Sequence, residues 1–146
     1  MDNGLLHLHN FLRWAILILL LLSLFHSLTR KPAVQKSSLF LMITAHTMLV
    51  IGLYQWLAGR YGLFTAELPE GVSMMKDKFY RFFQMEHPVM MIIAVVMITI
   101  ARKKAKALQY GKVAGFLLVA LLLILAAMPW PFREVVGRGW FPGVPA

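Results

Sequence analysis

The sequence FFQMEHPVMMIIAVVMITIARKK, residues 82–104, decides the fold, because an apolar run follows three residues that are unusual in a membrane. From Pro88 onward the run is apolar enough to enter a bilayer, but Glu86 and His87 stand at its start. As a helix, residues 88–101 cover only roughly 21 Å, which is less than a hydrocarbon core of about 30 Å. The run alone is therefore too short to cross a membrane.

We expect this helix to begin upstream, near residues 79–83, so that Glu86 and His87 lie inside the span. Pro88 has no backbone N–H group, and it is expected to bend the helix. The carbonyl group of Gln84 would then lack its usual partner and need another donor.

The composition places the whole chain in a membrane. The sequence has 146 residues, of which 60% are hydrophobic, and its mean hydropathy is +0.70. These values lie far outside the range of soluble globular domains. Four apolar runs predict one all-α domain over residues 1–146, an integral membrane four-helix up-down bundle. The predicted spans are residues 9–29, 38–58, 80–101 and 111–130, followed by a tail over 131–146 on the outer surface.

Composition also excludes several functions. The spans leave no room for a soluble catalytic domain. Because the chain has no cysteine, it forms no disulfide, no thiolate metal site and no covalent attachment of a c-type haem. Any haem would be bound non-covalently.

The net charge of +9 orients the helices and does not indicate a nucleic-acid partner. The basic residues cluster in the first and third connections, at Arg30, Lys31 and Lys36 and again over residues 102–112. The positive-inside rule places these connections in the cytoplasm, beside anionic lipid. Both termini and the long middle connection are then expected outside.

The middle connection contains a further helical pattern. Val72, Met75 and Phe79 recur at helical spacing, with Lys76 and Lys78 on the opposite side. This pattern is typical of a short helix that lies in the membrane interface. We therefore expect an interfacial helix between the second and third spans.

Two histidines are candidate ligands of a haem. Measured from the aromatic residues at the outer interface, His46 lies roughly 15 Å deep and His87 roughly 10 Å deep. Helix tilt can remove a difference of about 5 Å, so the two imidazoles are expected to face one another. Neutral imidazoles from two helices suit the iron of a haem b. His9 is the substitute for either ligand.

The charged residues in the outer half of the predicted spans also suit a bound haem. Arg13 and Arg81 lie at heights suited to the propionates of a haem. Arg13 is equally suited to an ion pair with Glu86, which the membrane tolerates better than either charge alone.

Two other interpretations stay open. The buried histidines and the pair of Arg13 with Glu86 would serve only helix packing in a non-redox accessory subunit. Alternatively, the imidazoles and the carboxylate of the outer third would bind zinc, copper or non-haem iron in a metal-binding membrane protein. Those metal ligands would be drawn from His7, His9, His46, Glu86 and His87.

Four segments resemble a family of small bacterial four-span membrane proteins labelled cytochrome b-like. They are LHLHNFLRW (residues 6–14), AHTMLVIGLYQW (45–56), RFFQMEHPVMM (81–91) and MPWPF (128–132). The resemblance spans nearly the whole chain and implies that His9, Arg13, His46, Glu86 and His87 are the characteristic polar residues.

The resemblance implies a multi-pass protein of the bacterial inner membrane. We expect an electron-transfer subunit that exchanges electrons with a quinol or a partner protein. With so little mass outside the membrane, it is expected to work with other subunits or as a homo-oligomer.

Overall fold

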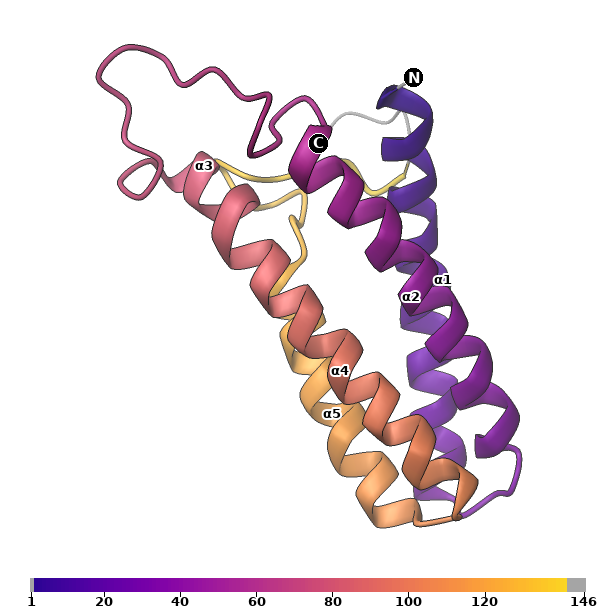
Figure 1. The fold of residues 1–146 in the computed structure, drawn as a ribbon. Helices are drawn as coiled ribbons and strands as arrows, with labels where there is room; N and C mark the ends of the chain where they lie inside the picture. The colour runs from indigo at the N-terminus through magenta and orange to yellow at the C-terminus, as the bar shows by residue number, and fades with distance from the viewer. Residues whose placement is uncertain (1, 142–146) are drawn as a thin grey trace.

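The structure is a computed structural model that describes residues 2–141, and this part of the chain is helical with no β-strand. Figure 1 shows the arrangement of the helices. Their bounds are α1 Asp2–Leu28, α2 Val34–Ala58, α3 Lys78–Arg81, the π-helix η1 Phe82–Glu86, α4 His87–Lys106 and α5 Tyr110–Ala127. The predicted all-α class is confirmed.

Four helical stretches are long and apolar enough to cross a membrane, as the sequence predicts. They are Asn3–Leu28, Val34–Ala58, Lys78–Lys106 and Tyr110–Ala127. The first begins several residues earlier than predicted, which makes His7 part of the helix as well as His9. The last ends at Ala127 because the next segment contains Pro129 and Pro131.

The third stretch begins at Lys78, close to the start that its length requires. The carboxylate of Asp77 accepts hydrogen bonds from the backbone N–H groups of Phe79 (2.9 Å) and Tyr80 (3.1 Å). Such a cap satisfies donors that the first helical turn leaves free. The prediction that Glu86 and His87 lie inside this stretch is confirmed.

The structure differs from the sequence prediction in the middle connection. No separate interfacial helix covers residues 72–83, because residues 72–77 are not helical and α3 runs directly into η1 and α4. The helical spacing of Phe79 and its neighbours thus belongs to the third span itself.

The segment before Pro88 is a π-helix. The backbone N–H of His87 reaches the carbonyl of Phe82, five residues earlier. The carbonyl of Gln84, which Pro88 cannot serve, accepts a hydrogen bond of 2.9 Å from the indole Nε1 of Trp56 on α2. The need for another donor, expected from the sequence, is met by a neighbouring helix.

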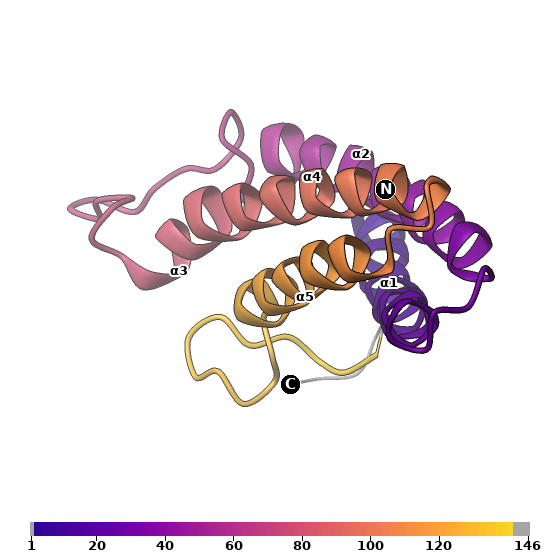
Figure 2. The ribbon, with the colours of Figure 1, turned by 90° about the horizontal axis from the view of Figure 1, so that it is seen from below.

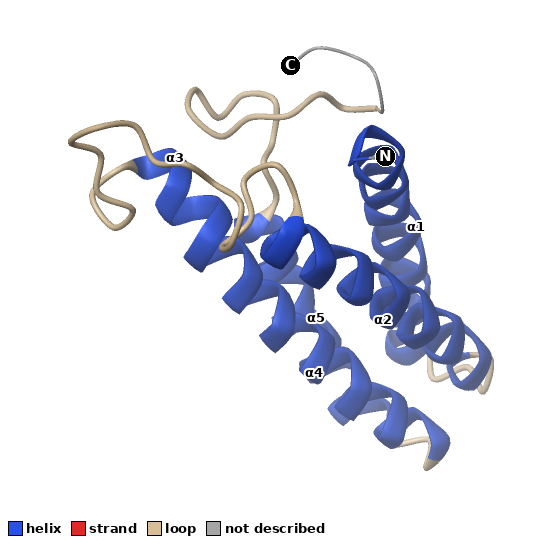
Figure 3. Cartoon of the chain, turned by 45° about the horizontal axis from the view of Figure 1, so that its top comes forward, coloured by secondary structure: helices blue, strands red, loops and turns tan. Residues whose placement is uncertain are grey.

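The helices pack in a cycle in which α1 contacts α2, α2 contacts α4, α4 contacts α5, and α5 contacts α1. Leu20, Leu41, Ile98 and Leu117 contribute fully buried side chains, one from each of these helices. Where α1 ends and α5 begins, the Ser27 hydroxyl donates to the carbonyl of Tyr110 (2.5 Å). Figures 1 and 3 show that the helices spread toward the opposite end, where α1 begins. We call this the cavity end.

Candidate functional site

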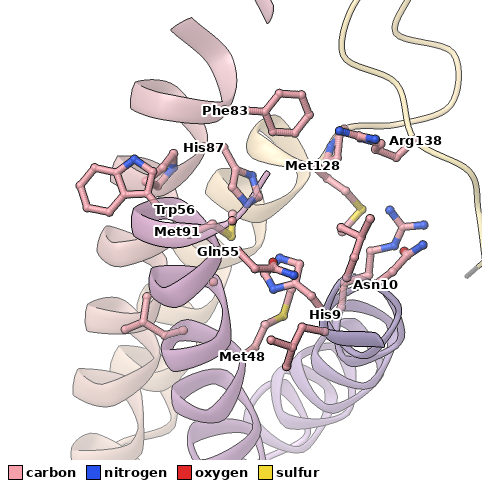
Figure 4. A pocket seen from close by; sticks show the side chains of 18 of the residues that line it. His9, Asn10, Met48, Gln55, Trp56, Phe83, His87, Met91, Met128 and Arg138 are labelled. Carbon is pink, nitrogen blue, oxygen red and sulfur yellow. The ribbon is translucent and has the colours of Figure 1, made fainter. Parts of the chain in front are cut away.

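A cavity of about 530 Å³ lies between the helices at the cavity end. Residues of α1, α2, α4 and α5, together with the segment after α5, line it. Its apolar wall includes Ala45, Met48, Met91, Ala94, Val95 and Ile124. Figure 4 shows Met48, Met91 and Met128 around the space into which polar side chains also reach. A mostly apolar cavity with a few convergent polar groups is the usual form of a small-molecule site.

Two histidines from different helices lie close together in this cavity. The ring centroids of His9 on α1 and His87 on α4 are 6.2 Å apart, with an angle of 61° between the ring planes. Figure 4 shows both side chains in the cavity. The structure therefore pairs His87 with the histidine that the sequence analysis regarded as a substitute ligand.

His87 is held in one tautomer. Its Nδ1 lies 2.8 Å from the carbonyl oxygen of Ala127. A carbonyl only accepts, so Nδ1 donates and Nε2 of the neutral ring keeps its lone pair. The carbonyl is free for this bond because α5 ends at Ala127 and its last carbonyls have no helical partner. A backbone carbonyl bound to one imidazole nitrogen is the usual support of a histidine that ligates a metal through the other.

His9 is fixed by packing and not by a hydrogen bond. A Cβ atom at Gly52 of α2 would stand 3.2 Å from its Cε1, so a side chain at this position would require the ring to shift by a few tenths of an ångström. Nδ1 of His9 is buried and has no hydrogen-bond partner within residues 2–141. Nδ1 of His9 therefore makes no hydrogen bond within these residues, whereas the ring of His87 is oriented by one.

The polar wall of α1 continues with Asn10 and Arg13. Oδ1 of Asn10 and Nε of Arg13 are also buried without a partner in the described part of the chain. Both residues line the cavity. Buried polar atoms are nearly always hydrogen-bonded in native proteins, so these three atoms make the α1 wall a candidate ligand-binding surface.

Arg13 also holds the segment after α5. Its Nη2 donates to the carbonyls of Gly139 (2.7 Å) and Trp140 (2.6 Å). The indole of Trp14 donates to the same Trp140 carbonyl (2.8 Å). This segment, residues 128–141, which we call the tail, thus runs from the end of α5 (Figure 2) to Arg13 and Trp14 of α1. The rest of the predicted tail, residues 142–146, lies outside the described residues.

The prediction of an ion pair between Arg13 and Glu86 is wrong. Glu86 accepts a hydrogen bond of 2.8 Å from Nε of Arg81, and both side chains are 39% exposed. Neither residue lines the cavity. The spacing of Arg81 and Glu86 across the π-helix brings them to the same face, while tail carbonyls occupy Arg13.

His46 does not face His87, contrary to the depth comparison. It is exposed, lies outside the cavity lining, and its Nδ1 donates to the carbonyl of Met42 one turn earlier (2.8 Å). The inward face of α2 includes Leu41 and Ala45, and His46 follows Ala45 by one residue, or roughly 100° of rotation. The depth of a residue along a helix does not tell in which direction its side chain points. Ala45, Met48 and Gly52 recur at helical spacing and all line the cavity, so this pattern in the sequence marks the inward face of α2.

The larger set of metal ligands predicted from the sequence does not come together in the structure. In residues 2–141 no group of three or more His, Asp or Glu side chains is placed to hold a metal ion. His7 is exposed at the edge of the cavity, and Glu86 is paired with Arg81 outside it. The histidine pair is the remaining candidate ligand set.

Fold and site together define a class: a helical protein with four potential membrane spans that enclose a cavity with a histidine pair. The chain matches no protein-family model, no curated protein and no solved structure. The likeness to cytochrome b-like proteins therefore remains a prediction.

Proposed function

We propose that the protein is a membrane b-type cytochrome that binds one haem between His9 and His87. The observation that carries the proposal is the separation of the two rings. A metal ion ligated from opposite sides by two imidazoles, at about 2 Å from each nitrogen, sets the ring centroids roughly 6 Å apart. The centroids of His9 and His87 are 6.2 Å apart.

The donor set favours haem over a bare metal ion. Two imidazoles leave zinc or copper short of protein ligands, whereas a porphyrin supplies four nitrogens of its own and needs only two axial ligands. Within the described residues no third carboxylate or imidazole joins the pair. The apolar walls and the volume of about 530 Å³ suit a planar macrocycle.

In this proposal the residues of the cavity have three roles. His87 presents a neutral Nε2 because Ala127 holds the proton of Nδ1, and His9 supplies the second nitrogen. Met91, Ala94 and Val95 give the site an apolar lining. When bound, the haem would supply one-electron redox chemistry, with a quinol or a partner protein as the electron donor or acceptor.

We further propose an up-down bundle in the bacterial inner membrane. Arg30 and Lys31 lie in the connection after α1, and Lys103, Lys104 and Lys106 lie in the last turn of α4. Both clusters are at the end opposite to the cavity end (Figure 1). By the positive-inside rule that end faces the cytoplasm, so the cavity and both termini face outward.

Absorption spectra of the purified full chain, oxidised and then reduced, test the proposal. We expect a Soret band and a sharp reduced α band of six-coordinate haem. His9→Ala and His87→Ala should each abolish the six-coordinate spectrum. His46→Ala is the matched control, because this histidine lies on the outer surface of α2, and it should leave the spectrum unchanged.

A colourless chain that takes up no added haem would contradict the proposal and favour the accessory-subunit interpretation. Loss of the six-coordinate spectrum in His46→Ala, with retention in His9→Ala, would contradict the ligand assignment.

A further inference from the structure

Arg13 is a buried cation without a carboxylate partner. Its side chain is 6% exposed. Its Nη2 bonds to two neutral carbonyls, and its Nε has no partner. The ion pair found in residues 2–141 joins two other residues, Arg81 and Glu86. A charge in the interior of a membrane protein is costly unless it is paired. An anionic group from a ligand would supply the missing partner.

A second cation lies on the same side of the cavity. The guanidinium of Arg138 in the tail stands 5.1 Å from the ring centroid of Phe83 and 5.9 Å from that of Tyr61. Figure 4 shows Arg138 and Asn10 on one side of the cavity. Gly139, the next residue, gives its carbonyl to Arg13. The tail therefore connects the two guanidinium groups.

The charge of the cavity lining has one sign. Arg13, Arg60 and Arg138 line the cavity, and no Asp or Glu is among its described lining residues. The lining residues Ala94 and Ile98 of α4, by contrast, are apolar. A ligand with acidic groups at one edge and an apolar body matches this division.

We propose that Arg13 and Arg138 bind the carboxylates of the ligand and thereby fix its orientation, with the acidic edge toward the tail. The proposal rests on the proposed function, in which these carboxylates are the two propionates of haem. It replaces Arg81, which the sequence analysis selected for this role, with Arg138. The Nε–H group of Arg13 stays available for this bond, because it is Nη2 that donates to the tail. A hydrogen bond from a guanidinium to a carboxylate is charge-assisted and therefore stronger than a neutral one.

Metal-free porphyrins test carboxylate recognition separately from iron ligation. The haem-free full chain in detergent is titrated with protoporphyrin IX and with its dimethyl ester, and porphyrin fluorescence reports the affinity. We expect the wild type to prefer the free acid by about tenfold or more, as charge-assisted hydrogen bonds predict. Arg13→Gln and Arg138→Gln should each reduce this preference several-fold and leave ester binding unchanged, which also shows that the variant is folded. Arg81→Gln is the control and should retain the full preference.

The outcomes separate the two proposals. If added haem gives the six-coordinate spectrum but acid and ester bind equally, carboxylate recognition is wrong and the function stands. If the acid is preferred through Arg13 and Arg138 while haem gives no six-coordinate spectrum, the axial ligands are wrong and the recognition stands. If neither porphyrin binds the wild type, the recognition is overturned.

Discussion

The indole Nε1 of Trp56 donates a hydrogen bond of 2.9 Å to the carbonyl oxygen of Gln84. This bond joins α2 to the π-helix that precedes Pro88. Proline leaves that carbonyl without a donor from its own helix, and a neighbouring helix provides one. His87 follows the π-helix directly, so the bond also supports the segment that places His87 in the cavity. π-Helical turns of this kind frequently occur at functional sites.

Trp56→Phe should weaken the π-helical segment. It removes the donor and leaves the carbonyl of Gln84 buried without a partner, a loss of about 1 kcal/mol or more. We expect faster amide hydrogen exchange in residues 82–86, measured by mass spectrometry in detergent. Trp130→Phe is the control, because that indole donates to the Leu125 carbonyl on α5 (2.8 Å). Equal exchange of residues 82–86 in wild type and Trp56→Phe would contradict this role of Trp56.

Hydropathy and length predicted the four long helices of this chain well, because the thickness of a membrane sets the length of an apolar helix. The third span shows this clearly, since a helix from Pro88 alone is too short and the structure begins it at Lys78. The free carbonyl of Gln84 also followed from the chemistry of proline. The identity of its donor did not, because it depends on how α2 lies against the π-helix.

The site was less predictable than the spans. Depth along a helix follows from residue counting, but the direction of a side chain depends on helix rotation, and this error selected His46. The pairing of Arg13 with Glu86, one of the two roles predicted for Arg13, was wrong because its partners are backbone carbonyls of the tail, which carry no sequence signal. Arg138 was missed for the same reason, since only the path of the tail brings it to the cavity.

Gly52 provides a test of the position of His9. A larger side chain at this site would meet the imidazole, because even a Cβ atom would stand 3.2 Å from its Cε1. Gly52→Leu should displace the ring and lower the affinity for haem at least several-fold, since a ligand must be held close to its productive position. Titration with haem, followed by the Soret band, measures the change.

Gly115→Ala on α5 is the matched control, because a Cβ atom there meets nothing within 4 Å. It should bind haem as the wild type does. Undiminished binding in Gly52→Leu would show that His9 does not need its observed position.

The tautomer of His87 can be measured by NMR spectroscopy. Donation to the Ala127 carbonyl (2.8 Å) requires a proton on Nδ1. We expect the ¹⁵N chemical shifts of the haem-free protein at neutral pH to show a protonated Nδ1 and a bare Nε2. His87→Ala assigns the signals by their loss. A proton on Nε2 would contradict the proposed orientation.

The ion pair of Arg81 with Glu86 should contribute little to stability. Both side chains are 39% exposed, and pairs of this kind contribute about 0–1 kcal/mol. We expect Glu86→Gln to change the unfolding midpoint in detergent only slightly and to leave haem binding unchanged. A loss of haem binding would instead place Glu86 in the site, as the metal-binding interpretation required.

The contacts of Trp14 should hold the tail against α1. The indole of Trp14 donates to the Trp140 carbonyl (2.8 Å) and lies with its ring centroid 6.3 Å from that of Trp140 and 6.0 Å from that of Phe141. Trp14→Leu removes the bond and the ring contacts, together about 1–2 kcal/mol. We expect trypsin to cleave after Arg138 several-fold faster in this variant, because the protease must first detach the tail. Phe11→Leu, at an exposed position of the same helix, should be cleaved like the wild type. Equal cleavage of Trp14→Leu and wild type would show that the contacts of Trp14 do not hold the tail in place.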